Sequence, residues 1–157
     1  MVSLRAAEPA DRALLREVYG STRAEELEPV PWTDDQKREF LDRQFDAQDT
    51  EYHRRYPQAR FDVILVDGEP AGRLYVDRRP DAVHILDIAL LPGFRNRGLG
   101  TGLLEELAAE AAAAGKRLTL YMEKFNPARA LYARLGFQEL SDEGVYVFMA
   151  REPTPAS

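Results

Sequence analysis

The most constraining feature of this sequence is an apolar strand that runs into a glycine-spaced turn and then directly into a helix. Residues 83–91 are almost continuously apolar, which is typical of a central strand buried on both faces. Pro92 and Gly93 end this run, and the turn Arg95-Asn96-Arg97-Gly98-Leu99-Gly100 follows. A helix is predicted over residues 98–114, because leucines and alanines recur there at spacings of three and four. This unit indicates an α/β fold.

The other predicted elements complete a mixed α/β architecture. β-rich runs bounded by turn residues predict strands at residues 2–5, 61–66, 72–76, 118–122, 137–140 and 145–149. Apolar spacing and capping residues predict helices at residues 9–20, from Thr33 to about Tyr52 or beyond, and at 127–135. Residues 21–32 are expected to form a loop, because they contain Pro29 and Pro31. The order predicts a mixed sheet with helices on both faces.

Length and composition exclude several classes of protein. With 157 residues, the chain is expected to form one domain over residues 1–151, followed by a loose tail at 152–157. It has no cysteine and only two histidines, so we expect no disulfide, catalytic thiol or metal. A formal charge of −6 argues against a nucleic-acid partner. No apolar run approaches the roughly 20 residues of a membrane helix, and the N-terminus lacks signal-peptide features. We therefore expect a cytoplasmic protein without a membrane partner.

The glycine-spaced turn has the chemistry of an anion-binding site. Gly98 and Gly100 let the backbone approach a ligand closely, and the first amides of the helix have no partner within the helix. Arg95 and Arg97 add positive charge at the rim. The structural alternative is a glycine-rich helix start with two solvated arginines. A P-loop would need a lysine that is absent, and a dinucleotide-binding fold would need a third glycine where Leu103 stands.

Two linked motifs resemble those of the GNAT superfamily of acyl-CoA-dependent N-acyltransferases. Arg95-x-x-Gly98-x-Gly100 after a buried strand is similar to the family's pyrophosphate motif. The segment Asn126-Pro127-Ala128-Arg129-Ala130-Leu131-Tyr132, with Leu135-Gly136-Phe137 after it, is similar to the family's second motif. Asn126 lies one residue closer to Tyr132 than in the commoner pattern, so we expect the helix start to be tightened at Pro127.

The resemblance implies a fold, a co-substrate and a set of binding residues. The fold is a central mixed, mostly antiparallel sheet of about seven strands, with a V-shaped splay between the fourth and fifth strands. Acetyl-CoA is the expected acyl donor. The residues that match the family's cofactor site are Ala89, Leu90, Leu91, Arg95, Asn96, Arg97, Gly98, Leu99, Gly100, Thr101, Asn126, Ala128 and Tyr132.

The resemblance also implies direct attack of a primary amine on the thioester while both substrates are bound. Tyr132 is the candidate general acid for the departing thiolate. His84, Asp87 and Glu123 are candidates for the base that deprotonates the amine, with Asp87 preferred and water as a further alternative. For each of these side chains the structural alternative is a satisfied core or surface group.

The acceptor is a small-molecule or peptide amine that the sequence does not identify. Aromatic side chains are candidates to line its pocket, although packing of the long helix is their alternative role. They are Trp32, Phe45, Tyr52, His53, Tyr56, Tyr75 and Tyr146. A homodimer is compatible with the resemblance. The alternative functions are a non-catalytic acyl-CoA-binding regulatory module and a mononucleotide-binding protein.

Overall fold

The computed structural model describes residues 1–153 and divides them into two compact units. The first unit comprises Met1–Tyr75 and Asp87–Gly100, and the second comprises Val76–Leu86 and the described chain from Thr101 onward. The single domain over residues 1–151 stays a prediction. Most of the predicted tail, residues 154–157, lies outside the described residues. Among the residues described, no helix is both long and apolar enough to cross a membrane.

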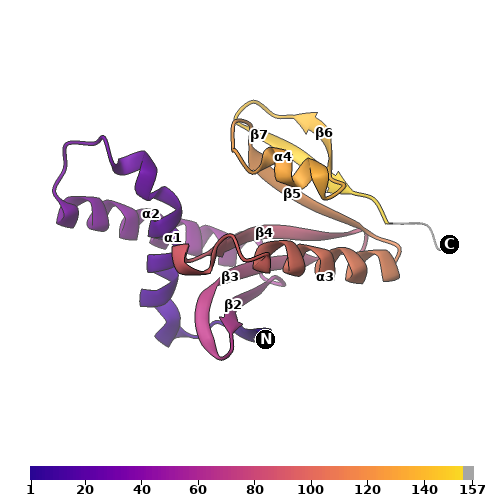
Figure 1. The fold of residues 1–157 in the computed structure, drawn as a ribbon, viewed down its shortest axis with the longest axis horizontal. Helices are drawn as coiled ribbons and strands as arrows, with labels where there is room; N and C mark the ends of the chain where they lie inside the picture. Colours follow the sequence, from indigo (N-terminus) through magenta and orange to yellow (C-terminus); the bar gives the residue numbers. More distant parts are fainter. Residues whose placement is uncertain (154–157) are drawn as a thin grey trace. The chain divides into compact units, whose positions relative to one another are not determined.

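The strands form a seven-stranded sheet in the order β1-β2-β3-β4-β5-β7-β6 (Figure 1). The pairs β1–β2, β5–β7 and β6–β7 are antiparallel, whereas β4 and β5 are parallel over Ala82–Ile85 and Arg117–Leu120. The strands are β1 Val2–Ala6, β2 Arg60–Val66, β3 Glu69–Arg78, β4 Ala82–Leu90, β5 Arg117–Glu123, β6 Gln138–Asp142 and β7 Tyr146–Arg151. The predicted mixed, mostly antiparallel sheet is confirmed.

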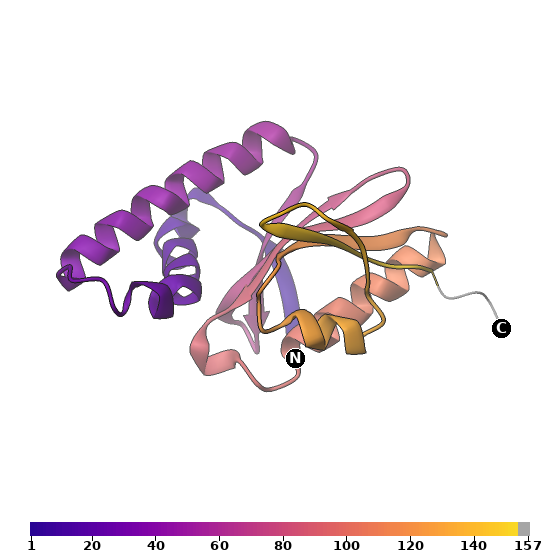
Figure 2. The same cartoon turned by 90° about the horizontal axis from the view of Figure 1, so that it is seen from above.

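Two long helices belong to the first unit and lie side by side (Figure 2). They are α1 Arg12–Leu27, entered through the 3-10 turn η1 Pro9–Asp11, and α2 Asp34–Arg55. The predicted capping box opens α2: the Gln36 amide donates to Thr33 Oγ1 at 3.1 Å, and the Thr33 amide donates to Gln36 Oε1 at 2.9 Å. These two bonds satisfy amides that the helix itself leaves without partners.

The loop predicted over residues 21–32 is wrong in its first half, because α1 continues to Leu27. The hydroxyl of Ser21 donates to the carbonyl of Val18 at 2.7 Å, and that of Thr22 donates to the carbonyl of Tyr19 at 2.6 Å. These bonds let polar residues stay within the helix instead of ending it. The chain leaves the helix only where the prolines begin.

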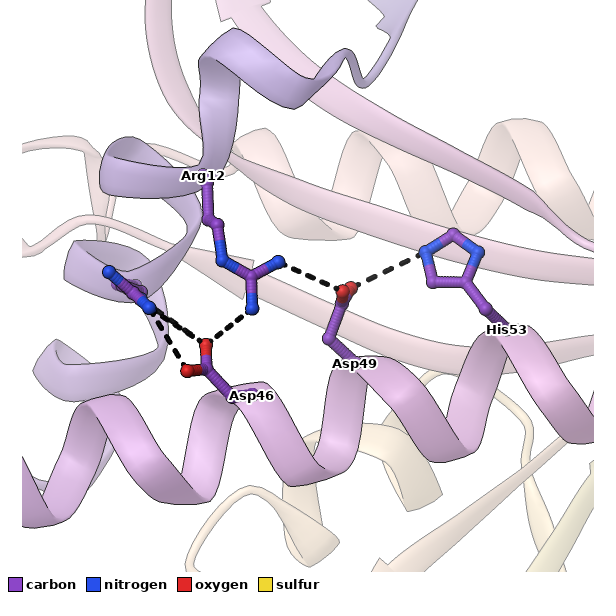
Figure 3. A network of polar contacts seen from close by, with 5 residues as sticks. Arg12, Asp46, Asp49 and His53 are labelled. Atoms are coloured by element: carbon purple, nitrogen blue, oxygen red, sulfur yellow. Dashed lines mark hydrogen bonds and ion pairs between the residues drawn. The ribbon is translucent and has the colours of Figure 1, made fainter.

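An apolar cluster holds α1 and α2 on the sheet of the first unit. Leu15, Tyr19, Phe45 and Val63 are buried together, with the rings of Tyr19 and Phe45 edge to face at 6.1 Å between centroids. Above this cluster, Arg12 donates to Asp46 at 2.6 Å and lies 3.4 Å from Asp49 (Figure 3). Such exposed ion pairs contribute about 0–1 kcal/mol each, so apolar burial dominates.

The second unit contains a long and a short helix. α3 Leu99–Ala113 runs into it from the turn, and its buried face is made of Leu103, Leu104, Leu107, Ala108 and Ala111. α4 Arg129–Arg134 is shorter than the predicted 127–135. The Asn126 side chain accepts from the Ala128 amide at 2.8 Å, and this turn delays the helix. The tightening expected at Pro127 stays a prediction, whereas the predicted start of the helix at residue 127 is two residues too early.

Candidate functional site

The turn between β4 and α3 is shaped by two residues with left-handed backbone. The 3-10 turn η2 Pro92–Phe94 reverses the chain after β4, with the Phe94 amide donating to the Leu91 carbonyl at 2.9 Å. Asn96 then has φ +62° and Gly98 has φ +75°. Glycine adopts this conformation freely, and asparagine tolerates it better than most residues do. The sequence predicted a close backbone approach at Gly98 and Gly100, but not the left-handed backbone at Asn96.

The amides of this turn are open to a ligand. Asn96, Arg97 and Gly98 are exposed, and within residues 1–153 their amides donate no hydrogen bond to the protein. A Cβ built on Gly98 would meet no atom within 4 Å. The amides at the start of α3 also lack acceptors one turn back, as at every helix N-terminus. Successive free amides at a helix start bind anions, phosphate groups above all.

Arg95 braces the turn instead of only adding charge at its rim. Its Nε donates to the Leu90 carbonyl at 2.9 Å, at the end of β4. Its Nη2 donates to Ser21 Oγ at 3.2 Å, in the part of α1 for which the sequence predicts a loop. Arg97 lies over the Phe94 ring, with 5.4 Å from Cζ to the ring centroid. Arg97 makes no hydrogen bond or ion pair with the described residues, so its guanidinium remains available beside the open amides.

Gly72 on β3 lets β4 pass unusually close at Ala89 and Leu90. A Cβ on Gly72 would lie 2.1 Å from the Ala89 carbonyl oxygen and 2.9 Å from the Leu90 Cα. On the next residue, the Leu91 amide donates to the Ala71 carbonyl at 2.8 Å. Glycine within a strand often marks such an approach of two backbones. This role of Gly72 is not predictable from the sequence, because the strand pairing on which it depends is not visible in one sequence.

Asp87, the preferred base candidate, makes an ion pair within the first unit. Its Oδ2 accepts from Arg73 Nη2 at 2.7 Å, and the same nitrogen donates to Gln48 Oε1 at 2.9 Å. The Arg73 side chain is 2% exposed and that of Asp87 is 18% exposed. The charged group in an apolar strand has therefore found a buried partner, as its surroundings require.

His84, the second base candidate, is buried in the second unit. It is 3% exposed, and its Nδ1 lies 2.7 Å from the Oγ1 of the buried Thr119. Burial and the charge of Arg79 lower its pKa to about 4, against an opposing effect of Asp77. The imidazole is consequently neutral at pH 7 and a weak proton acceptor. This environment fits a satisfied structural histidine.

The second motif places its residues on the connection between β5 and β6. Glu123 ends β5, and its carbonyl accepts from the Asn126 amide at 3.0 Å. Tyr132 in α4 is 8% exposed and meets the Phe137 ring edge to face at 5.4 Å between centroids. Its amide donates to the Ala128 carbonyl at 3.1 Å. The second unit thus brings Glu123, Asn126, Ala128 and Tyr132 into one short segment.

A model of the acetyltransferase (GNAT) family matches residues 21–137. The chain belongs to the GNAT family. Mycothiol acetyltransferase of Thermobifida fusca is 35% identical to it over 92 residues, which are 56% of this chain. The match spans only 28% of the length of that relative.

Solved structures share the GNAT fold across the whole chain. PaiA N-acetyltransferase of Thermoplasma acidophilum, in complex with coenzyme A, has a TM-score of 0.72 and 15% identity over 97% of this chain and 99% of its own. The ribosomal-protein-S18-alanine N-acetyltransferase of Escherichia coli has a TM-score of 0.64 and 22% identity, covering 100% and 97%. At these identities the likeness shows the fold.

Three of the aromatic residues expected around a GNAT acceptor surround one cavity of the first unit. This cavity has a volume of about 600 Å³, and Phe45, His53 and Tyr75 are among its lining residues. Tyr52 packs against Tyr75, with 6.0 Å between ring centroids. Trp32 and Tyr146 are 42% and 47% exposed. The acceptor role of these residues stays a prediction.

The environment of His84 predicts a pH-dependent stability. As the pH falls from about 6.5 to about 4, the unfolded chain takes up this proton before the folded protein does. The free energy of unfolding should therefore decrease by roughly 3 kcal/mol over this window, at about 1.4 kcal/mol per pKa unit. Urea unfolding between pH 7 and 4 measures it. His84→Gln should remove this part of the slope, and His53→Gln should keep it; equal slopes in all three proteins would refute the assignment.

The close approach at Gly72 predicts that a single methyl group is not tolerated. Gly72→Ala places a Cβ against the backbone of Ala89 and should cost about 1–3 kcal/mol of stability, since strands must move apart. It should also weaken coenzyme A binding, measured by calorimetry. Gly93→Ala is the matched control, because a Cβ there meets nothing within 4 Å. Unchanged stability and affinity in Gly72→Ala would contradict the argument.

Proposed function

We propose that this GNAT protein is an acetyl-CoA-dependent N-acetyltransferase that acts on a primary amine of a small molecule or peptide. The observation that carries the proposal is the row of exposed amides at Asn96, Arg97 and Gly98, without acceptors among residues 1–153. Membership of the acetyltransferase family supports the same reaction class.

The turn is proposed to bind the pyrophosphate of coenzyme A. Hydrogen bonds to a charged group contribute about 1.5–3 kcal/mol each, and the helix N-terminus adds roughly 0.3–1 kcal/mol. Amides of Asn96–Gly100 and the Arg97 side chain can provide several such bonds. Arg95 is proposed to hold the turn in shape, because its guanidinium is already bonded to Leu90 and Ser21. Leu99 and Thr101 are proposed to contribute through the backbone at the start of α3.

The remaining roles follow the family motifs. Backbone groups of Ala89, Leu90 and Leu91 are proposed to bond the pantetheine chain and polarise the thioester carbonyl. Asn126 and Ala128 are proposed to contact the cofactor, and Tyr132 to donate a proton to the thiolate as it leaves. The amine nitrogen forms the new bond to the acetyl carbon as the bond from carbon to sulfur breaks.

The amine must lose its proton for this attack, because an alkyl ammonium has a pKa near 10.4. Asp87, Glu123 and water remain the proposed acceptors of that proton. His84 is the least suited of the candidates, because burial lowers its pKa to about 4. Asp87 has one oxygen bonded to Arg73 and the other without a partner among the described residues.

A thiol-release assay tests the proposed reaction. The protein is mixed with acetyl-CoA and a panel of primary amines, and free coenzyme A thiol is followed with a chromogenic disulfide. At least one class of amine should release thiol in proportion to acetylated product. Coenzyme A binding without thiol release from any amine would support a regulatory module instead. Thermal protection by ATP or NAD, with none by coenzyme A, would indicate a nucleotide-binding protein.

Tyr132→Phe tests the proposed general acid. The variant keeps the ring that contacts Phe137, so the fold should be preserved. Turnover should fall at least about tenfold, since general acid catalysis commonly contributes 10²–10⁴-fold, while the Kd for acetyl-CoA should change little. Tyr121→Phe, which removes the hydroxyl of a half-exposed tyrosine on β5, is the control. An unchanged kcat in Tyr132→Phe would remove this residue from the mechanism.

A further inference from the structure

Arg73 is a cation buried in the first unit among aromatic rings. Its side chain is 2% exposed. Its Cζ lies 4.9 Å from the ring centroid of Tyr75, 5.6 Å from that of Tyr19 and 5.9 Å from that of Phe45. A guanidinium removed from water destabilises the fold unless charge and hydrogen bonds compensate for the lost solvent. At this position the compensation must come from the surrounding rings and from the hydrogen bonds of the guanidinium.

The hydrogen bonds of Arg73 are few for a buried arginine. Nη2 donates to Asp87 and Gln48, whereas Nε and Nη1 have no hydrogen-bond partner among the described residues. The guanidinium therefore contacts the carboxylate through one nitrogen only, and the aromatic rings hold the rest of it. Asp87 Oδ1 has no partner in the described chain, and its side chain is 18% exposed.

Another arginine–aspartate pair of the same unit shows a different geometry. Arg5 holds Asp11 by two bonds, Nη1 to Oδ2 at 2.7 Å and Nη2 to Oδ1 at 2.8 Å. Both oxygens of Asp11 are thus engaged, as expected of a structural fork. In the pair of Arg73 and Asp87 only one oxygen is engaged. The second oxygen remains available to a ligand.

The position of this pair connects it with the proposed acyl site. Asp87 precedes Ala89 by two residues on β4, and Arg73 directly follows Gly72 on β3, whose backbone closely approaches Ala89 and Leu90. Adjacent residues of β3 therefore give β4 its close backbone contact and the buried cation for Asp87. Both features act on the same short segment of β4.

We propose that Asp87 binds the ammonium group of a cationic amine acceptor through Oδ1, and that Arg73 is the positioning residue that holds Asp87 for this. The inference rests on the proposed N-acetyltransferase function and specifies its substrate class. A carboxylate favours a positively charged amine over a neutral or acidic molecule of the same size. Gln48 Oε1 accepts a second hydrogen bond from Arg73 Nη2, so it helps to hold the guanidinium beside Asp87.

The test compares Asp87→Asn, Arg73→Lys and the double variant by steady-state kinetics. The probes are cadaverine, phenethylamine and glycinamide, and the best acceptor of the wild-type protein is used throughout. Asp87→Asn should raise the KM for the amine at least about tenfold and leave the KM for acetyl-CoA within about twofold. Arg73→Lys should also raise the KM for the amine. In the Asp87→Asn background it should raise this KM little further, because the effects of coupled residues are not additive.

Arg5→Lys is the matched control, since it loosens a structural ion pair of the same unit without raising the amine KM. If Arg73→Lys does not fold, Gln48→Met replaces it and should raise the amine KM through the same route. Additive effects, or equal changes in the KM of both substrates, would overturn the positioning role. An amine KM unchanged in Asp87→Asn would overturn the binding site.

Failure of the proposed function gives a different result. If the wild-type protein releases no thiol with any amine, binding of cadaverine to the protein loaded with coenzyme A is measured by calorimetry. Binding that is lost in Asp87→Asn and kept in Arg5→Lys would support the amine site without acetyl transfer. No binding to the wild-type protein would overturn the amine site as well.

Discussion

The left-handed backbone at Asn96 and Gly98 is the constraint on which the proposed chemistry depends. Where β4 ends and α3 begins, residues 96–98 are exposed, and their amides donate no hydrogen bond within residues 1–153. Because this turn is open to solvent, its conformation depends on contacts with residues outside the turn. Arg95 supplies these contacts by bonding to the Leu90 carbonyl and to Ser21. The proposed anion site therefore combines local backbone geometry with one long-range side-chain contact.

Two buried polar groups near the same strand are stabilised in different ways. His84 is neutral and has Thr119 beside it, so it carries no charge into the interior at pH 7. Arg73 keeps its charge and is stabilised by Asp87, Gln48 and aromatic faces. A neutral, satisfied histidine fits a structural role. Asp87 lies beside a buried cation, and its Oδ1 has no partner among the described residues, which fits a binding role; this contrast distinguishes the two candidates.

Local sequence patterns predicted much of the fold, but they did not predict the contacts between residues that are distant in the sequence. The capping box at Thr33 and the turn at Gly98 follow from local chemistry and were predicted, whereas the mostly antiparallel sheet was expected from the resemblance to the GNAT superfamily. The continuation of α1 through Ser21 was not, because hydroxyl bonds to preceding carbonyls compete with the loop signal of the prolines. The pairing of Arg73 with Asp87 and the approach at Gly72 depend on strand register, which a single sequence does not contain.

The most direct measurement is the affinity for coenzyme A of Gly98→Ala and Gly100→Val, determined by calorimetry on proteins of verified fold. A Cβ at Gly98 would meet no protein atom within 4 Å, and one at Gly100 would lie 3.9 Å from Leu90 Cδ1, so a Cβ fits at both positions. Gly68→Ala controls for backbone strain, because Gly68 has φ +82° and a similarly open surrounding. The account predicts binding at least about tenfold weaker in both turn variants, a loss of about 1.4 kcal/mol, and unchanged binding in the control. Wild-type affinity in the turn variants would contradict it.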